Sequence, residues 1–260
     1  MKRLLLALLS GLLIALSLSG CAKKTDAGSS GAADSSGSSG AVQTPVITEK
    51  LSPSDSYSAF NEGKALPLDR IINAFYETED MWGIGMTLSN VYWADLTMIS
   101  LAFFTGDEAT TKSALAMLGL GDADYSQSGN TYTLKYDSDD GIKYVDTAVY
   151  DATKDFMVFE QLADGAVTIH TEYYRTATGY IAVYNSASSE GGYLVYKIYA
   201  DGQDGSVGIE QSDSVVTLKG NETKDFATSS PQWYKVEGDL VTGIDSNGNP
   251  IELSAIIESE

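Results

Sequence analysis

The second half of the chain is a succession of short segments rich in β-branched and aromatic residues, with no helical pattern between them. Short polar turns join these segments, and the Asp164-Gly165 pair between two of them is a strong hairpin signal. Strands joined by short turns pair as antiparallel neighbours, whereas a parallel sheet needs long crossover connections. The sequence therefore predicts one antiparallel β-meander from residue 131 onward. The predicted strands are 131–137, 142–150, 156–163, 166–174, 179–185, 193–200, 207–211, 215–218, 233–236, 240–244 and 251–257.

The region before this meander, residues 54–119, has apolar residues at the three- and four-residue steps of helices. Pro67 and Asp69 are typical of a helix start, and the two glycines of segment 81–85 are expected to interrupt the pattern. The expected helices begin near residues 67, 88 and 108. The predicted fold class is α+β, with N-terminal helices packed on a large curved antiparallel β-meander that is half-barrel-like or an open barrel.

The N-terminal segment has the features of an export signal. A basic start, residues 1–3, precedes an apolar run that extends to Leu18, which is typical of a secretory signal peptide. The segment Leu18-Ser19-Gly20-Cys21 then resembles the lipobox of bacterial lipoproteins, in which an aliphatic residue, a small residue and Gly or Ala precede a cysteine. This resemblance implies that Cys21 receives a diacylglyceryl group on its sulfur and that the chain is cut before it.

The resemblance and the composition together divide the chain into three parts. Residues 1–20 are the expected lipoprotein signal peptide. Residues 21–45 are the expected lipidated Cys21 and a flexible tether rich in Ala, Gly and Ser. Residues 46–260 are expected to form a single extracytoplasmic domain, helical over 54–119 and β-rich over 131–260. The expected location is the cell envelope, with the protein lipid-anchored to the extracytoplasmic face of the membrane.

The net charge of the chain limits the classes of molecule that it can bind. The chain has a net charge of −20, which argues against nucleic-acid binding, because that needs clustered Lys and Arg against phosphate. The same charge repels anionic lipid surfaces, so the anchor at Cys21 is expected to hold the protein to the membrane.

The residues that usually carry catalysis or bind metals give little signal. His170 is the single histidine, and strand alternation places it on the polar, solvent-facing side of its strand. One histidine and one lipidated cysteine do not make a common zinc set. The segment 245–249 begins like a calcium loop, but Pro250 occupies the position of the required Gly, so we expect a hairpin turn. We predict no catalytic residue, no metal site and no cofactor.

Three residues in the predicted helical region are speculative candidates for a ligand site, namely Trp82, Trp93 and Asp95. The two tryptophans either fill the core, as large aromatic residues usually do, or line a ligand space on the inside of the sheet. Asp95 lies at a solvent-exposed edge, pairs in the core, or faces a cavity, and we favour the edge. A membrane span through this segment is disfavoured, because Asp95 would lie in mid-bilayer.

The two faces of the strands differ in composition. In segment 179–185, Tyr180 and Tyr184 oppose Ile181 and Val183. We expect the aliphatic face to pack on the helices and the tyrosine-rich face to remain partly exposed. The layout is similar to that of bacterial lipoproteins that carry lipids in a half-barrel, a resemblance of architecture and not of motif.

These observations favour a membrane-anchored, non-catalytic binding or carrier module. Its expected ligand is small or apolar and lies between the curved sheet and the helices. The alternative is a structural or assembly lipoprotein that presents the tyrosine-rich face to an envelope protein or glycan. A hydrolase that uses Asp or Glu ranks third, because nothing in the sequence singles out a pair of carboxylates.

Overall fold

The computed structural model describes residues 50–76, 78, 81–98, 100, 108–117, 119 and 122–255. All of them belong to one of two compact units, Ser39–Glu260. The helices of this described part are α2 (Pro53–Ala74), α3 (Met81–Thr97) and α4 (Glu108–Met117). Its strands are β1 (Asp124–Ser128), β2 (Thr131–Asp137), β3 (Lys143–Asp151), β4 (Phe156–Ala163), β5 (Ala166–Arg175), β6 (Gly179–Ala187), β7 (Tyr193–Asp201), β8 (Asp204–Ser212), β9 (Gln232–Glu237), β10 (Leu240–Ile244) and β11 (Pro250–Ser254).

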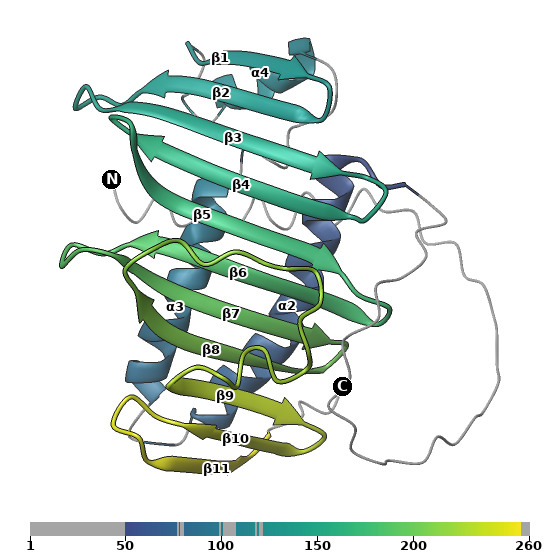
Figure 1. Cartoon of the computed structure of the whole chain (residues 1–260), viewed down its shortest axis with the longest axis vertical. Coiled ribbons are helices and arrows are strands. Elements are labelled where there is room, and N and C mark those ends of the chain that lie inside the picture. The colour runs from purple at the N-terminus through teal and green to yellow at the C-terminus, as the bar shows by residue number, and fades with distance from the viewer. Residues whose placement is uncertain are drawn as a thin grey trace. The chain divides into compact units, whose positions relative to one another are not determined.

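The strands form one sheet in chain order from β1 to β11, and each strand pairs antiparallel with its neighbours (Figure 1). Within the described residues β1 and β11 are the two edges, so the sheet is open. The predicted α+β fold with a β-meander is therefore confirmed. The hairpin between β4 and β5 shows why: Asp164 and Gly165 have φ of 49° and 84°, the positive values that a tight hairpin turn needs.

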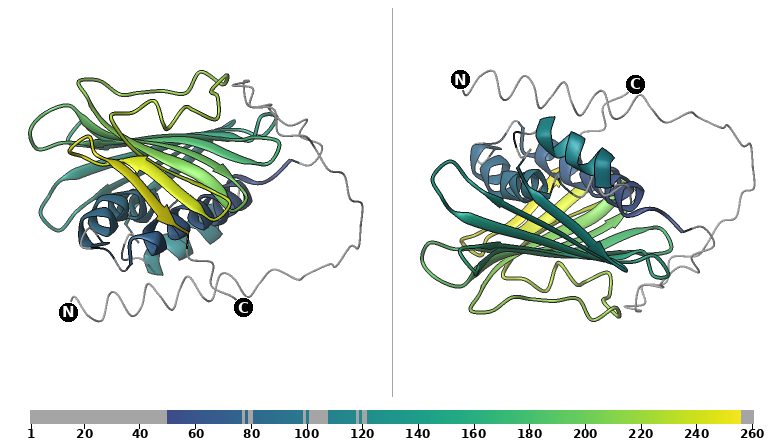
Figure 2. Two further views of the ribbon diagram at one scale, coloured as in Figure 1. Left: turned by 90° about the horizontal axis from the view of Figure 1, so that it is seen from below. Right: turned by 90° about the horizontal axis from the view of Figure 1, so that it is seen from above.

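The sequence misassigned two segments of the sheet. β1 was not predicted, and residues 215–218, predicted as a strand, lie outside the sheet. They belong to the connection between β8 and β9, residues 213–231, which we call the strap. The strap crosses the sheet over β5 to β8, on the face opposite to the helices (Figures 1 and 2).

Both long helices begin earlier than the sequence pattern indicated. α2 starts at Pro53, and the side chain of Ser52 caps it by accepting a hydrogen bond from the backbone N–H of Asp55 (3.1 Å). Pro67, the predicted start, lies inside α2, where it packs against β8 at Gly205. α4 lies where it was expected.

α3 starts at Met81 and includes the two glycines that were expected to interrupt it. Each glycine costs a helix about 1 kcal/mol relative to alanine. The inner side of α3 offsets this cost by burying Ile84, Leu88 and Val91 in the core. No helix among the described residues is long and apolar enough to cross a membrane.

The tyrosine-rich side of β6 faces the helices, and this reverses the prediction. Tyr184 is fully buried, and its hydroxyl donates to the Asp95 carboxylate of α3 (2.8 Å). Tyr180 packs edge-on against Phe60 of α2, with 5.6 Å between ring centroids. Ile181 instead lies in a small cluster under the strap. Asp95 of α3 provides a polar partner for the Tyr184 hydroxyl, so this ring can be buried without leaving its hydroxyl unpaired.

Candidate functional site

Asp95 is paired inside the helix layer and does not lie at an open edge. Its carboxylate oxygen Oδ2 lies 2.7 Å from Nζ of Lys64, a side chain that is 1% exposed. Tyr184 donates to Oδ1, and the hydroxyl of Tyr57 donates to the backbone oxygen of Asp95 (2.9 Å). Lys64 also donates to Asn61, and its Nζ lies 4.6 Å from the centre of the Phe60 ring. The preferred edge position is therefore wrong, and the core pairing is what occurs.

Burial dominates the electrostatics of this pair. Burial raises the pKa of Asp95, and the nearby Lys64 ammonium counteracts that rise. Burial likewise lowers the pKa of Lys64, against the influence of Asp95. Each charge is thus tolerated because the other is present. The pair joins α2 to α3.

The two candidate tryptophans point away from the sheet. Trp82 is 78% exposed and Trp93 is 65% exposed, so they neither fill the core nor line a space inside the sheet. Met86, on the same helix, is 67% exposed. The structure therefore does not bring Trp82, Trp93 and Asp95 together into one site.

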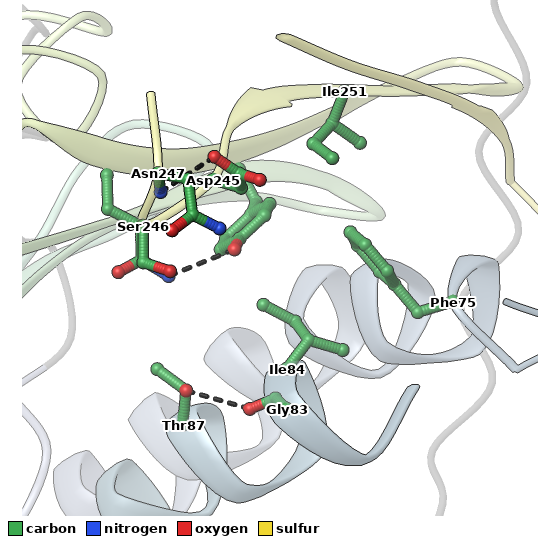
Figure 3. A pocket seen from close by; sticks show the side chains of 10 residues that line it. Phe75, Gly83, Ile84, Thr87, Asp245, Ser246, Asn247 and Ile251 are labelled. Atoms are coloured by element: carbon green, nitrogen blue, oxygen red, sulfur yellow. Dashed lines mark hydrogen bonds between the residues drawn. The ribbon is translucent and has the colours of Figure 1, made fainter. Parts of the chain in front are cut away.

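A small cavity lies between the helices and the last strands (Figure 3). Its volume is about 150 Å³. Phe75, the C-cap of α2, and Ile84 of α3 point toward Ile251 of β11 on its apolar side, while the turn of Asp245 and Asn247 forms its polar side. This is the helix–sheet space in which the sequence placed a ligand. Its volume matches that of cavities that hold a benzene ring, well below the roughly 300–1,000 Å³ of ordinary ligand pockets.

The turn beside this cavity is the expected hairpin. Oδ1 of Asp245 accepts hydrogen bonds from the backbone N–H groups of Asn247 (2.8 Å) and Asn249 (2.7 Å). These bonds lower the pKa of Asp245, and they occupy an oxygen that a calcium loop would use for the ion.

A larger pocket lies on the opposite face, between the strap and the ends of β4 and β5, and we call it the strap pocket. Its volume is about 380 Å³. Phe156, Tyr174 and Leu218 supply its apolar surface. Lys154, from the β3–β4 turn, and Lys219, from the strap, also line it, and Nζ of Lys154 lies 3.9 Å from a carboxylate oxygen of Asp151. The remaining lining residue is Gly220.

Buried polar side chains fix the strap that forms one wall of this pocket. Glu222 of the strap accepts hydrogen bonds from the Tyr174 hydroxyl (2.7 Å) and from the backbone N–H of Gly220 (3.0 Å). Asn185 of β6 holds Val216 from both sides, donating to its carbonyl (2.9 Å) and accepting from its N–H (2.8 Å). These contacts replace the ladder bonds that a strand at 215–218 would have made.

His170 also lies beneath the strap, and its predicted solvent-exposed position is wrong. It is buried, with Nε2 2.9 Å from Glu172 and Nδ1 3.3 Å from Glu160. Burial alone would lower the pKa of His170, but the two carboxylates outweigh burial and raise it. The second oxygen of Glu172 accepts the backbone N–H of Leu218 (2.7 Å). His170 thus supports a carboxylate that holds the strap.

Another buried acid, Asp155, was not found from the sequence. Its oxygen Oδ1 accepts hydrogen bonds from Ser56 (2.5 Å) and Tyr150 (2.9 Å). Its oxygen Oδ2 lies 2.9 Å from Nε of Arg175, close enough for an ion pair although the two are not aligned as a hydrogen bond. Ser56 is completely buried, so a substrate cannot reach it. The cluster ties the first turn of α2 to the β3–β4 turn.

Comparison with protein-family models, curated proteins and solved structures gives no match to this chain. Within the described residues no group of three or more His, Cys, Asp or Glu side chains is arranged to hold a metal ion. The strap pocket could not be found from the sequence, because its lining residues come from three segments that are about 20 and 45 residues apart along the chain.

Proposed function

We propose that this protein is a lipid-anchored extracytoplasmic binding module that holds a small ligand in the strap pocket. The ligand class that fits has an apolar body and a negatively charged group. The proposal keeps the binding or carrier role expected from the sequence and moves the site to the other face of the sheet.

The strap pocket carries this proposal by its size and its lining. A volume of about 380 Å³ falls in the range of ligand pockets, whereas the helix–sheet cavity does not. Aromatic and aliphatic side chains form its walls, as in most small-molecule sites. Its two lysines carry positive charge in a chain with a net charge of −20, and the exposed ion pair of Lys154 with Asp151 is weak at 3.9 Å. An anionic group would therefore be drawn to this position in preference to the surrounding acidic surface.

The lining favours binding over catalysis. The described residues around the strap pocket include two lysines and one tyrosine, and no Ser or Cys that a neighbouring base could activate. Burial raises the pKa of Tyr174 beyond the range in which it could act as a base near neutral pH, and its hydroxyl already donates to Glu222. The alternative of a partner-binding tyrosine face loses its support, because Tyr173, Tyr184 and Tyr196 are buried.

The pocket is tested with 8-anilinonaphthalene-1-sulfonate, a probe with apolar rings and one sulfonate. The full chain carrying Cys21→Ser, which lacks the acylated sulfur, is titrated and the probe fluorescence is followed. We expect one probe per chain, and about tenfold weaker binding after the double change Lys154→Met and Lys219→Met. The matched control is Lys135→Met, which removes an exposed lysine on β2.

Two results would contradict this assignment. Equal probe affinity in the double variant and in the Lys135→Met control would mean that the two pocket lysines do not contribute. Binding of many probes per chain, in variants whose urea unfolding midpoints are also lowered, would mean that the probe reports loosened packing of the protein and not the strap pocket.

The anchor is tested separately. Changing Cys21 to Ser should leave the chain without acyl groups and move it from the membrane fraction to the soluble fraction. A Cys21→Ser chain that still sediments with membranes after a high-salt wash would refute the lipid anchor.

A further inference from the structure

The outer side of α3 is apolar and exposed. Trp82, Met86 and Trp93 are 78%, 67% and 65% exposed. They lie four and seven residues apart, so at about 3.6 residues per turn they fall on one side of the helix. The opposite side of α3 is buried against α2 and the sheet. α3 therefore presents three large apolar side chains on one exposed side, with the uncharged Ser89 and Asn90 between Met86 and Trp93.

This surface is also uncharged, in contrast to the rest of the chain. The chain has 36 acidic and 16 basic residues, yet the single charged residue of α3 is Asp95, which is turned inward to Lys64. An exposed apolar patch without charge marks a surface that contacts something apolar. In a protein with a net charge of −20, such a patch is where a lipid surface can approach with the least repulsion.

The length of the N-terminal chain places a lipid surface within reach. The predicted lipidated Cys21 and Lys50, the first described residue, are separated by 28 residues, which even a fully extended chain could not stretch beyond about 100 Å. A bilayer held within that distance meets the domain at a high effective concentration, so even a weak surface contact forms. Tryptophan is the side chain most enriched at the level of lipid headgroups.

We propose that α3 rests on the bilayer that holds the lipid anchor, with Trp82, Met86 and Trp93 inserted at headgroup level. This inference relies on the anchor of the proposed function and not on the strap pocket. α3 and the strap cover opposite faces of the sheet, so the strap pocket then opens on the side away from the bilayer (Figure 2).

The contact is tested by fluorescence quenching. The lipidated chain is reconstituted into vesicles of phosphatidylcholine whose acyl chains are brominated near the headgroup, and into the same vesicles without bromine. Trp233 provides an internal control, because it lies on the strap side of β9, whereas its neighbour Tyr234 packs against Phe75 of α2. One variant, Trp233→Phe, keeps the two α3 tryptophans. The other, Trp82→Phe with Trp93→Phe, keeps Trp233 alone.

We expect bromine to lower the emission of the Trp233→Phe chain by about twofold or more and to leave the other variant unchanged. Replacing a third of the lipid by phosphatidylglycerol should reduce this quenching at low salt, and added sodium chloride should restore it. Absence of quenching in a chain that sediments with the vesicles would overturn the proposal. A blue-shifted tryptophan emission in the absence of lipid, together with a doubled native mass of the chain, would also overturn it, because a second copy of the chain would then cover α3.

Failure of the anchor has a different signature. A lipidated chain that does not sediment with the vesicles would refute the anchor itself. In that event the Cys21→Ser chain, mixed with a large excess of the same brominated vesicles, decides the question for α3. Quenching of Trp82 and Trp93 there would support the contact, and none would overturn it.

Discussion

Changing Lys64 to Met tests whether the buried pair with Asp95 holds the helix layer together. Lys64 is 1% exposed and its ammonium lies 2.7 Å from the Asp95 carboxylate, so methionine fills most of the same space and removes the charge. The Asp95 carboxylate then stays between α2, α3 and β6 with the hydroxyl of Tyr184 as its remaining strong partner. An ionised acid in this position has lost the group that made its burial tolerable.

The magnitude follows from the desolvation of the remaining charge. Removing one member of a buried ion pair costs about 3–5 kcal/mol of unfolding free energy. Because burial raises the pKa of Asp95 even with Lys64 present, part of this cost is avoided if the carboxyl takes up a proton. We therefore expect Lys64→Met to lower the free energy of unfolding by about 3 kcal/mol near pH 7, and by less at acidic pH. The double change of Lys64 to Met and Asp95 to Leu should recover most of the loss.

The assay is urea unfolding of the full chain carrying Cys21→Ser, followed by circular dichroism. With a slope of about 2 kcal/mol per molar urea, the single change should lower the midpoint by about 1.5 M. Lys112→Met serves as the control, because that exposed lysine pairs with Glu108 at the surface of α4. A loss below about 1 kcal/mol, or a double variant no more stable than Lys64→Met, would refute the reasoning.

Three further changes test the strap and the buried titratable groups. A Cβ on Gly208 would lie 1.9 Å from the carbonyl oxygen of Ala227, so Gly208→Ala should push the strap off the sheet and speed its cleavage by trypsin. Gly85→Ala is the control, because Gly85 has open space around it, and equal cleavage of the two variants would contradict this packing of the strap. Burial raises the pKa of Asp146 from 3.8 to about 7, so the folded protein favours the protonated carboxyl and its stability falls as pH rises through that window. Asp146→Asn should raise the melting temperature at about pH 8 and change it little at about pH 4, and equal shifts at both pH values would exclude this linkage. The pKa of His170 is raised above 6.5 in the folded protein, so the stability that the protonated imidazole contributes is present at low pH and lost as pH rises through the folded-state pKa. His170→Gln should therefore cost more stability at about pH 6 than at about pH 9, and equal losses in urea unfolding midpoint at the two pH values would exclude this.

The sheet could be predicted from the sequence because its signals are local. Alternating apolar residues and short polar turns identify each hairpin without reference to distant residues. The two misassigned segments are those in which the local sequence signal disagrees with the strand pairing in the sheet. β1 has a single buried side chain, Tyr125, and is a strand because it pairs with β2. Residues 215–218 have the β-branched composition of a strand, but side chains of β5 and β6 hold their backbone.

The helix starts were missed for a different reason. Ser52, Pro53 and Asp55 form a visible capping sequence, but the stronger signal of Pro67 drew the predicted start downstream. Proline inside a helix costs about 3 kcal/mol, and the burial of Phe60 and Leu68 on either side of it outweighs that cost. Propensity decides helix boundaries only where tertiary packing is weak.

The positions of the three ligand candidates could not be predicted, because partners across the fold leave no trace in one sequence. Lys64 and Asp95 are 31 residues apart and gave no shared pattern. The exposed position of Trp82 and Trp93 is contrary to the usual burial of large aromatic residues, and it depends on which side of α3 meets the sheet. Their helical spacing could have indicated a common face, but not that this face is turned outward.

The position of the strap pocket on β5 indicates which part of it can respond to a ligand. Tyr173 and Tyr174 are neighbours on that strand and point to opposite faces. Tyr173 stacks on Phe60 of α2, with 4.0 Å between ring centroids, so the core holds the strand that carries the Tyr174 wall. The opposite wall is the strap, whose backbone is held largely by side chains, including Asn185 and Glu172. Because a few side-chain bonds open more readily than a packed strand, ligand binding should order or displace the strap and leave β5 unchanged. Amide hydrogen exchange that changes in the strap alone would agree with this division, and a change spread evenly over β5 would contradict it.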